Sequence, residues 1–258
     1  MKQTEENIYT IAAVEKAFEV LEYVARHSHD VSAIEIHSHT GIAKPTLHKT
    51  LQTLRALGYI EQNPETTHYY PTMKMLQVAY YTLNRHDFFM TYYPYVQMYM
   101  RRFCCPTSLV TYSGSDPVIV YSSVGTSNVI VDRTRVTGST MPLYASSSGR
   151  LFLAELEEEE ARKLLSDVPL TPMTGTTLCT VEEILAFVQD VKKKGYCRID
   201  GEVYYGFTNF AFPLRDMQDR LVGSLNLVIP QDRLEKLMTE EAVQEVLTTL
   251  GKIRLPVA

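Results

Sequence analysis

Apolar residues recur every three or four positions near the start of the chain and predict successive amphipathic helices. The first predicted helix runs from Ala12 to about His27. Ser32 and Glu35 have the spacing of a capping box, which predicts that a second, short helix begins there. A third helix is predicted over residues 44–57, because three leucines fall within about 60° of one another on its surface. This apolar stripe consists of Leu47, Leu51 and Leu54.

The residues that follow favour a winged helix-turn-helix domain. Gly41 supplies a tight turn between the second and third helices, since glycine readily adopts left-handed backbone angles. Residues 59–72 predict a small β-wing with a turn at Asn63-Pro64-Glu65. The order helix, turn, helix, wing is typical of domains that present one helix to the major groove of DNA. We therefore expect a DNA-binding domain over residues 1–72.

The rest of the pattern predicts a linker helix within residues 73–87 and a second domain over residues 88–258. Its strands are interspersed with helices, so the fold class is α+β, with helices around one antiparallel sheet. The expected strands cover residues 108–112, 118–124, 129–133, 207–214 and 221–229. The expected helices cover residues 73–85, 88–105, 148–156, 157–165, 181–194 and 233–250.

Composition agrees with a globular protein, since 45% of the 258 residues are hydrophobic and 21% are charged. The sequence has no apolar run of about 18 residues and no apolar leader, so we expect a cytoplasmic protein that does not contact a membrane. A net charge of −5 argues weakly against DNA binding. The third helix carries only basic charges, however, at Lys44, Lys49 and Arg55. Local charge therefore permits DNA binding.

Several segments follow one another in an order typical of one protein family. They are Gly41–Lys49, Leu54–Ile60, Met141–Arg150, Gly195–Glu202 and Gly206–Pro213. Together they resemble the recognition helix, the entry into the wing, the ligand-holding loop and the C-terminal signature of the IclR family of bacterial transcription regulators. The resemblance implies a winged helix-turn-helix, a linker helix and a GAF-like effector-binding domain. It also implies homodimers, often paired into tetramers, that bind partly palindromic double-stranded DNA operators under the control of a small-molecule effector.

The polar side of the third helix supplies most of the candidate DNA contacts. Glutamine reads adenine with two hydrogen bonds, and lysine or histidine reaches guanine acceptors or phosphate. Residues at the edges of the helix and on the wing are candidates for phosphate contacts that position the protein. The alternative is that these are ordinary solvated surface residues. The complete set is Ser32, Lys44, Pro45, Thr46, His48, Lys49, Gln52, Thr53, Arg55, Thr66, Thr67 and His68.

Three consecutive serines followed by a glycine predict the start of a helix at Ser147 or Ser148, where free backbone N–H groups favour an anionic group such as a carboxylate. The resemblance implies an effector site made of Ser146, Ser147, Ser148, Gly149, Asp200, Asn209 and Asn226. The candidates for its walls, which ordinary core packing explains equally well, are Tyr112, Tyr121, Met141, Leu143 and Tyr144. Asn209 and Asn226 stand where the family usually has cysteine and serine. The alternative is that the serines cap the helix, Asp200 caps a turn, and the asparagines satisfy buried backbone groups.

Two other function classes stay open at this point. A hydrolase would use Ser146–Ser148, but the sequence has no GxSxG motif and no histidine beyond His86. An architectural DNA-binding protein would use its second domain only to dimerise. The alternate-residue histidines, at positions 27 and 29 and at 37 and 39, have no cysteine nearby to complete a zinc site. We therefore expect no metal and no cofactor.

Overall fold

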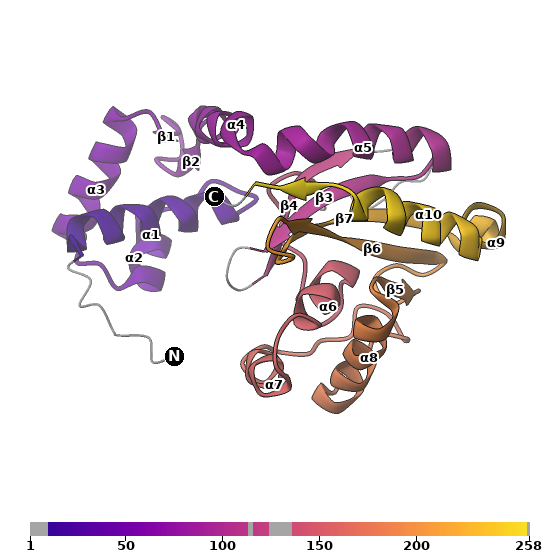
Figure 1. Cartoon of the computed structure of the whole chain (residues 1–258). Helices are drawn as coiled ribbons and strands as arrows, with labels where there is room; N and C mark the ends of the chain where they lie inside the picture. The colour runs from indigo at the N-terminus through magenta and orange to yellow at the C-terminus, as the bar shows by residue number, and fades with distance from the viewer. Residues whose placement is uncertain (1–9, 113–115, 124–135, 257–258) are drawn as a thin grey trace. The chain divides into compact units, whose positions relative to one another are not determined.

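The computed structural model describes residues 10–112, 116–123 and 136–256, and the chain forms two compact units, residues 1–83 and 84–258 (Figure 1). The strand predicted over residues 129–133 lies outside the described residues. Each unit has its own hydrophobic core. Among the described helices, none is both long enough and apolar enough to cross a membrane.

Three helices and a two-stranded sheet form the core of the first unit. The helices are α1 (Ala12–Arg26), α2 (Ala33–Thr40) and α3 (Lys44–Ala56), and the strand β1 (Ile60–Gln62) pairs antiparallel with β2 (Tyr69–Pro71). Each of these elements contributes buried side chains to one core, and those of α3 are the predicted leucine stripe. The predicted winged helix-turn-helix is therefore confirmed.

Hydrogen bonds at the two ends of α2 explain its length. The Ser32 hydroxyl accepts from the Glu35 N–H at 3.2 Å, and the Glu35 carboxylate accepts from the Ser32 N–H at 2.7 Å. Hydrogen bonding by the Ser32 hydroxyl and by the Ser32 N–H lowers the pKa of the Glu35 carboxyl below its usual value, because it favours the charged form. At the other end, Gly41 has a φ of 66°, which a side chain would make strained. The predicted capping box and turn are both present.

The helix α4 (Lys74–Arg85) begins against the end of α3. The Lys74 ammonium donates to the Leu57 carbonyl at 2.5 Å and lies 4.8 Å from the centre of the Tyr59 ring. The Thr72 hydroxyl donates to the Gly58 carbonyl at 2.5 Å. These contacts join the start of the predicted linker helix to the helix-turn-helix. None of the residues of α4 is buried.

The second unit is built on a six-stranded sheet in the order β4-β3-β7-β6-β5, with β8 added to β6. The strands are β3 (Thr107–Tyr112), β4 (Pro117–Ser123), β5 (Cys197–Asp200), β6 (Phe207–Asp216), β7 (Leu221–Pro230) and β8 (Arg254–Leu255). All neighbours along this order are antiparallel, and β8 pairs with β6 in parallel. The sheet is therefore mostly antiparallel, as predicted.

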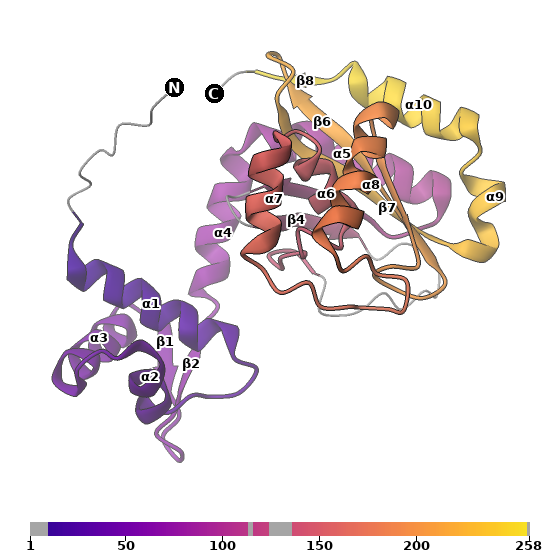
Figure 2. The same ribbon diagram turned by 90° about the horizontal axis from the view of Figure 1, so that it is seen from below.

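Helices cover both faces of this sheet, as Figures 1 and 2 show. One face carries α5 (Asp87–Phe103) and α10 (Glu240–Gly251), and the other carries α6 (Ser147–Leu153), α7 (Glu158–Ser166) and α8 (Val181–Lys194). Side chains alternate between the faces along each strand. On β6, Phe210 and Phe212 pack with α5 and α10, whereas Ala211 packs with α6 and α8. Asn209 shares the face of Ala211.

The structure differs from the sequence predictions for this unit in two ways. The short strands β5 and β8 were not predicted. The single helix expected over residues 233–250 is divided into a 3₁₀ turn (Gln231–Arg233), α9 (Leu234–Leu237) and α10. Met238 leaves the helical conformation, and the Thr239 hydroxyl accepts from the Ala242 N–H at 3.3 Å to begin α10. The apolar pattern over residues 233–250 is continuous, but the Thr239 cap begins a new helix within it.

Candidate functional site

The polar side of α3 is exposed, opposite its buried leucine stripe. Lys44, His48, Lys49 and Gln52 are all exposed, and within the described part of the chain no hydrogen bond or ion pair engages their side chains. Pro45 occupies the first turn, where its missing N–H costs little. This side of the helix therefore offers basic and amide groups that are free to contact phosphate oxygens and base edges.

Some predicted DNA-contacting residues have partners within the protein. The Ser32 hydroxyl caps α2, and the Thr53 hydroxyl donates to the Lys49 carbonyl at 2.9 Å. The Arg55 guanidinium donates to the Gln62 side chain at 2.9 Å. Of the remaining predicted residues, Thr46, Thr66 and Thr67 are exposed and His68 is partly exposed.

The predicted effector residues around α6 fall into two groups, and the first consists of residues that bond to one another. The Ser146 hydroxyl accepts from the Gly149 N–H at 3.0 Å and caps α6. The Ser148 and Ser224 hydroxyls are 3.0 Å apart, and the Asn226 amide donates to Ser148 at 2.5 Å. Ser224 donates in turn to Asn226 at 2.8 Å. These last three side chains form a closed, buried polar triangle, of which Ser224 was not predicted.

The second group is Ser147 and Asn209, two buried residues that each have a side-chain polar atom without a hydrogen-bond partner among the described residues. The Ser147 hydroxyl and the Asn209 side-chain carbonyl lack a hydrogen-bond partner within the described residues, although the residues are only 1% and 6% exposed. Leaving a buried polar atom unpaired costs about 1–3 kcal/mol. Since α6 packs on β6, both residues belong to the same side of the sheet. Such atoms are suitable partners for a bound ligand.

Close packing of α6 against the preceding loop explains why residue 149 is a glycine. A Cβ atom at this position would lie 2.1 Å from the Leu143 carbonyl oxygen. Only glycine therefore lets α6 approach the preceding loop so closely. Leu143 and Tyr144 are buried there, and Met141 is partly buried. The ring of Tyr112 lies 5.1 Å from that of Phe152 on the same side of the sheet.

Asp200 and Tyr121 do not join these residues. Asp200 pairs with Thr208 across β5 and β6, and it is Ile199 that pairs with Asn209. Because neighbouring residues of a strand face opposite sides, Asp200 points away from α6. Its carboxylate instead pairs with Arg198 and accepts from the Thr208 hydroxyl at 2.5 Å. Tyr121 also packs on the opposite face, beside α5.

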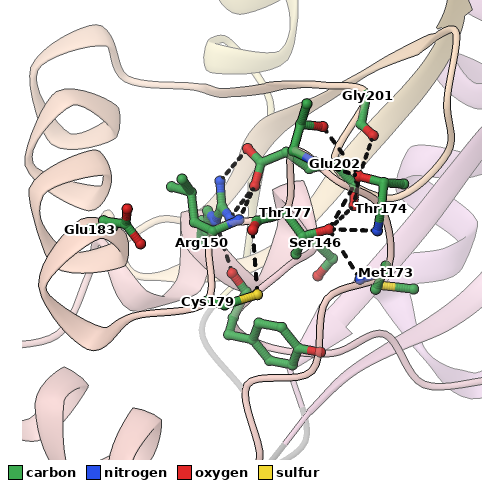
Figure 3. A network of polar contacts seen from close by, with 12 residues as sticks. Ser146, Arg150, Met173, Thr174, Thr177, Cys179, Glu183, Gly201 and Glu202 are labelled. Atoms are coloured by element: carbon green, nitrogen blue, oxygen red, sulfur yellow. Dashed lines mark hydrogen bonds and ion pairs between the residues drawn. The ribbon is translucent and has the colours of Figure 1, made fainter.

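A buried ion pair beside the serines was not predicted (Figure 3). Arg150 is 0% exposed, and its two terminal nitrogens donate to the Glu202 carboxylate at 2.7 and 2.5 Å. Its Nε donates to the Tyr144 carbonyl at 2.9 Å, and its guanidinium lies 4.6 Å from the centre of the Phe187 ring. Arg150 therefore joins α6 to the loop before it, to α8 and to the turn after β5.

Threonines extend this network to the segment before α8 (Figure 3). The Thr174 hydroxyl donates to the Gly201 carbonyl at 2.8 Å, and the Thr177 hydroxyl donates to the Glu202 carbonyl at 2.6 Å. The Leu178 N–H donates to the Glu202 carboxylate at 3.0 Å. Hydrogen bonds thus connect residues 171–179 with residues 201–206, next to the Arg150–Glu202 ion pair. The partners are too far apart in sequence for a spacing motif to reveal them.

Comparison with known proteins assigns the family. A model of the IclR helix-turn-helix domain matches residues 13–64, and a model of the C-terminal domain of bacterial IclR transcriptional regulators matches residues 80–254. The chain belongs to the IclR family. The HTH-type transcriptional regulator XynR of Escherichia coli K12 is 26% identical over 225 residues, which cover 87% of this chain and 88% of XynR.

Solved structures of IclR proteins agree with this fold. An IclR regulator from Alicyclobacillus acidocaldarius superposes with a TM-score of 0.77 at 21% identity, over 95% of this chain and 96% of that one. An IclR homologue from Microbacterium hydrocarbonoxydans, crystallised with 4-hydroxybenzoate, gives 0.72 at 19% identity, over 94% and 100%. The family and the fold predicted from the sequence are confirmed. The protein is a DNA-binding transcriptional regulator of the effector-controlled IclR type.

Proposed function

We propose that the exposed side of α3 reads operator DNA, with Lys49 and Gln52 as its central contacts. The observation that carries this proposal is a basic and polar helix face whose side chains have no partners within the described part of the protein. Gln52 suits adenine, and Lys49 suits guanine or phosphate. Three exposed basic side chains on α3, with no acidic one, favour the approach of a polyanion despite the net charge of −5.

The effector site is proposed at Ser147 and Asn209, with a small carboxylate that also carries a hydroxyl as its ligand. The two unpaired buried polar groups there supply hydrogen bonds and no charge. Arg150 is adjacent in sequence, but its guanidinium already bonds Glu202 and the Tyr144 carbonyl. The Ser147 hydroxyl, a neutral donor, would therefore hold the carboxylate, and the Asn209 side-chain carbonyl would accept from the hydroxyl of the ligand. The homologue crystallised with 4-hydroxybenzoate carries a ligand of this kind.

Dimerisation is proposed through the apolar surface of the first unit. Met73, just before α4, is 79% exposed, and Leu76 and Tyr81 on α4 are 66% and 67% exposed. Phe18 on α1 is 60% exposed. Exposed apolar surface of this kind is typical of association sites. A second copy of the chain is the proposed occupant, since two reading helices suit a partly palindromic operator. Sedimentation of the full chain would test this, and a monomer at micromolar concentration would contradict it.

We propose that the effector controls DNA binding through α4. Its first residue holds the end of α3 through the Lys74–Leu57 hydrogen bond, so a displacement of α4 carries the reading helix with it. Effector binding would therefore change the spacing of the two reading helices in a dimer. Coupling of this kind requires that the effector bind the DNA-competent and incompetent forms with different affinity.

The DNA assignment is tested with the full-length protein and a duplex carrying its own upstream intergenic sequence. Lys49→Ala with Gln52→Ala should abolish preferential binding to this duplex over random DNA, measured by fluorescence anisotropy. The matched control is Lys193→Ala with Gln244→Ala, which removes the same residue types from α8 and α10. Equal losses in the two double variants, or no binding by the wild type at about 50 mM salt, would contradict the proposal.

The effector assignment is tested by thermal shift with a panel of small carboxylates that includes 4-hydroxybenzoate. Asn209→Ala should lose the shift while the ligand-free protein still binds DNA. Asn63→Ala, on the wing, is the reciprocal control and should keep the shift. If a carboxylate of the panel raises the melting temperature of both variants as much as that of the wild type, Asn209 does not contact the effector.

We further propose that the protein has no hydrolytic activity of its own. The partners of the buried Ser148 hydroxyl are Ser224 and Asn226, and neither is a general base. Ester hydrolysis that disappears in Ser147→Ala would contradict this.

A further inference from the structure

A single glutamine connects the reading helix to the turn of the wing. The Arg55 guanidinium, in the last turn of α3, donates to the Gln62 side-chain carbonyl at 2.9 Å. The Gln62 side-chain N–H donates to the Thr67 carbonyl at 2.9 Å. Both ends of the Gln62 amide are thus used. Arg55 and Gln62 line a groove of about 630 Å³ between α3 and β1, which Gln52 also lines.

The turn that Gln62 holds is strained at the point of contact. Thr67 has a φ of 62°, in the left-handed region that a β-branched residue rarely adopts. Inside the turn, the Asn63 side chain accepts from the N–H groups of Glu65 and Thr66 at 3.0 and 3.3 Å. The Thr67 N–H donates to the Asn63 carbonyl at 2.9 Å. The Thr67 carbonyl is left facing Gln62, which links this closed turn to the helix.

The wing turn has no lysine or arginine to attract DNA, and its one carboxylate, Glu65, repels phosphate. Residues 63–68 read Asn-Pro-Glu-Thr-Thr-His, without lysine or arginine. Its contacts with a duplex therefore consist of short polar groups, which depend on exact placement. Placement relative to α3 is what the Arg55–Gln62–Thr67 connection supplies.

We propose that Gln62 and Arg55 are positioning residues, which hold the wing at a fixed distance from the reading helix. Arg55 acts through Gln62, in place of the phosphate contact expected from the sequence. The inference rests on α3 reading DNA, and it adds that the wing is a second contact whose position is set from α3.

A phosphate-contacting role and a positioning role of Arg55 predict different effects of salt on DNA affinity. A basic side chain that neutralises a phosphate releases a counterion, so losing it lowers the slope of log K against log salt by about 0.9. A positioning role releases no counterion. Arg55→Ala and Gln62→Leu should then both weaken binding and leave the slope unchanged. Because Arg55 acts only through Gln62, the double variant should be no weaker than Gln62→Leu alone.

The test uses full-length protein and a duplex enriched from a random library by the wild type, with anisotropy titrations between about 50 and 200 mM salt. Each single variant should lose about three- to tenfold in affinity, the effect of one or two exposed hydrogen bonds. Hydroxyl-radical footprints should lose the wing's protection in both variants and keep that of α3. Thermal melts of the variants should match the wild type, which separates positioning from folding.

Two control variants make the outcomes distinguishable. Lys49→Ala should lower the salt slope by about 0.9, and Gln244→Leu on α10 should bind as the wild type does. If Arg55→Ala lowers the slope while Gln62→Leu binds normally, Arg55 touches phosphate and the positioning role is wrong. Additive losses in the double variant would also overturn it. A library from which the wild type enriches no sequence would instead refute DNA reading by α3.

Discussion

Replacing Glu202 by glutamine should destabilise the effector unit far more than the same change at a surface ion pair. Glu202 accepts two hydrogen bonds from Arg150 and one from the Leu178 N–H. In Glu202→Gln, one carboxylate oxygen becomes an NH₂ group that faces a guanidinium donor. Arg150 is 0% exposed, so its charge would then be buried without a counter-charge. Breaking a buried pair in this way costs about 3–5 kcal/mol.

The matched control is the Glu155–Arg215 pair in the same unit. It has the same two-bonded geometry, at 3.0 and 2.7 Å, but its side chains are 35% and 22% exposed. Glu155→Gln should therefore cost at most about 1 kcal/mol. For a unit of this size, the expected loss in Tm is about 6–20 °C for Glu202→Gln and less than about 4 °C for the control.

The measurement is thermal unfolding of the full chain, followed by circular dichroism. Hydrogen–deuterium exchange of peptides over residues 141–154 and 171–206 assigns the change to this network. Faster exchange should appear in both segments, because the ion pair ties one to the other. The reasoning is refuted if the two variants melt within about 2 °C of each other, a difference of about 1 kcal/mol or less.

Other consequences of the packing can be measured directly. Gly149→Ala should lower the Tm and abolish effector-induced thermal shifts, because the added Cβ would meet the Leu143 carbonyl at 2.1 Å; an unchanged Tm would contradict this. Native alkylation should label the exposed Cys104 and spare Cys105 and Cys197, which peptide mass spectrometry can check. Burial raises the pKa of each of these two thiols from 9.0 to about 12. Unfolded thiols therefore lose protons first, and the free energy of unfolding should fall as the pH rises from about 9 to 12. Denaturant titrations across that range should show a smaller decline in a Cys105→Ala, Cys197→Ala double variant, in which the buried Tyr92, whose pKa is also raised to about 12, still contributes.

The elements of the first unit could be predicted because their signals are local. The Ser32–Glu35 capping box, the Gly41 turn and the leucine stripe of α3 each act within a few residues of the chain. Exposure of the polar side of α3 follows from that stripe, since a helix that buries one face leaves the other in solvent. The Arg55–Gln62 bond lay beyond this reasoning, because it depends on how the wing folds back.

The polar contacts of the second unit depend on tertiary structure. Ser148 meets Ser224 and Asn226 from more than 70 positions away, and Arg150 meets Glu202 from 52 away. No spacing rule connects residues at such distances. The serine and glycine pattern did predict the start of α6, but it could not separate the serine that caps the helix from the one left unpaired.

Asp200 illustrates how one missed element changes an assignment. The strand β5 was not predicted, so the alternation of its side chains could not be used, and Asp200 was placed with Asn209 by its position in the family signature. With β5 paired to β6, Ile199 stands beside Asn209 and Asp200 faces the other side. Asp200 is thus one residue away from the position that faces Asn209, and its side chain lies on the opposite face of the sheet. The apolar Ile199 makes that part of the proposed pocket less polar, which favours an effector with an apolar body between its polar ends over a fully hydroxylated one.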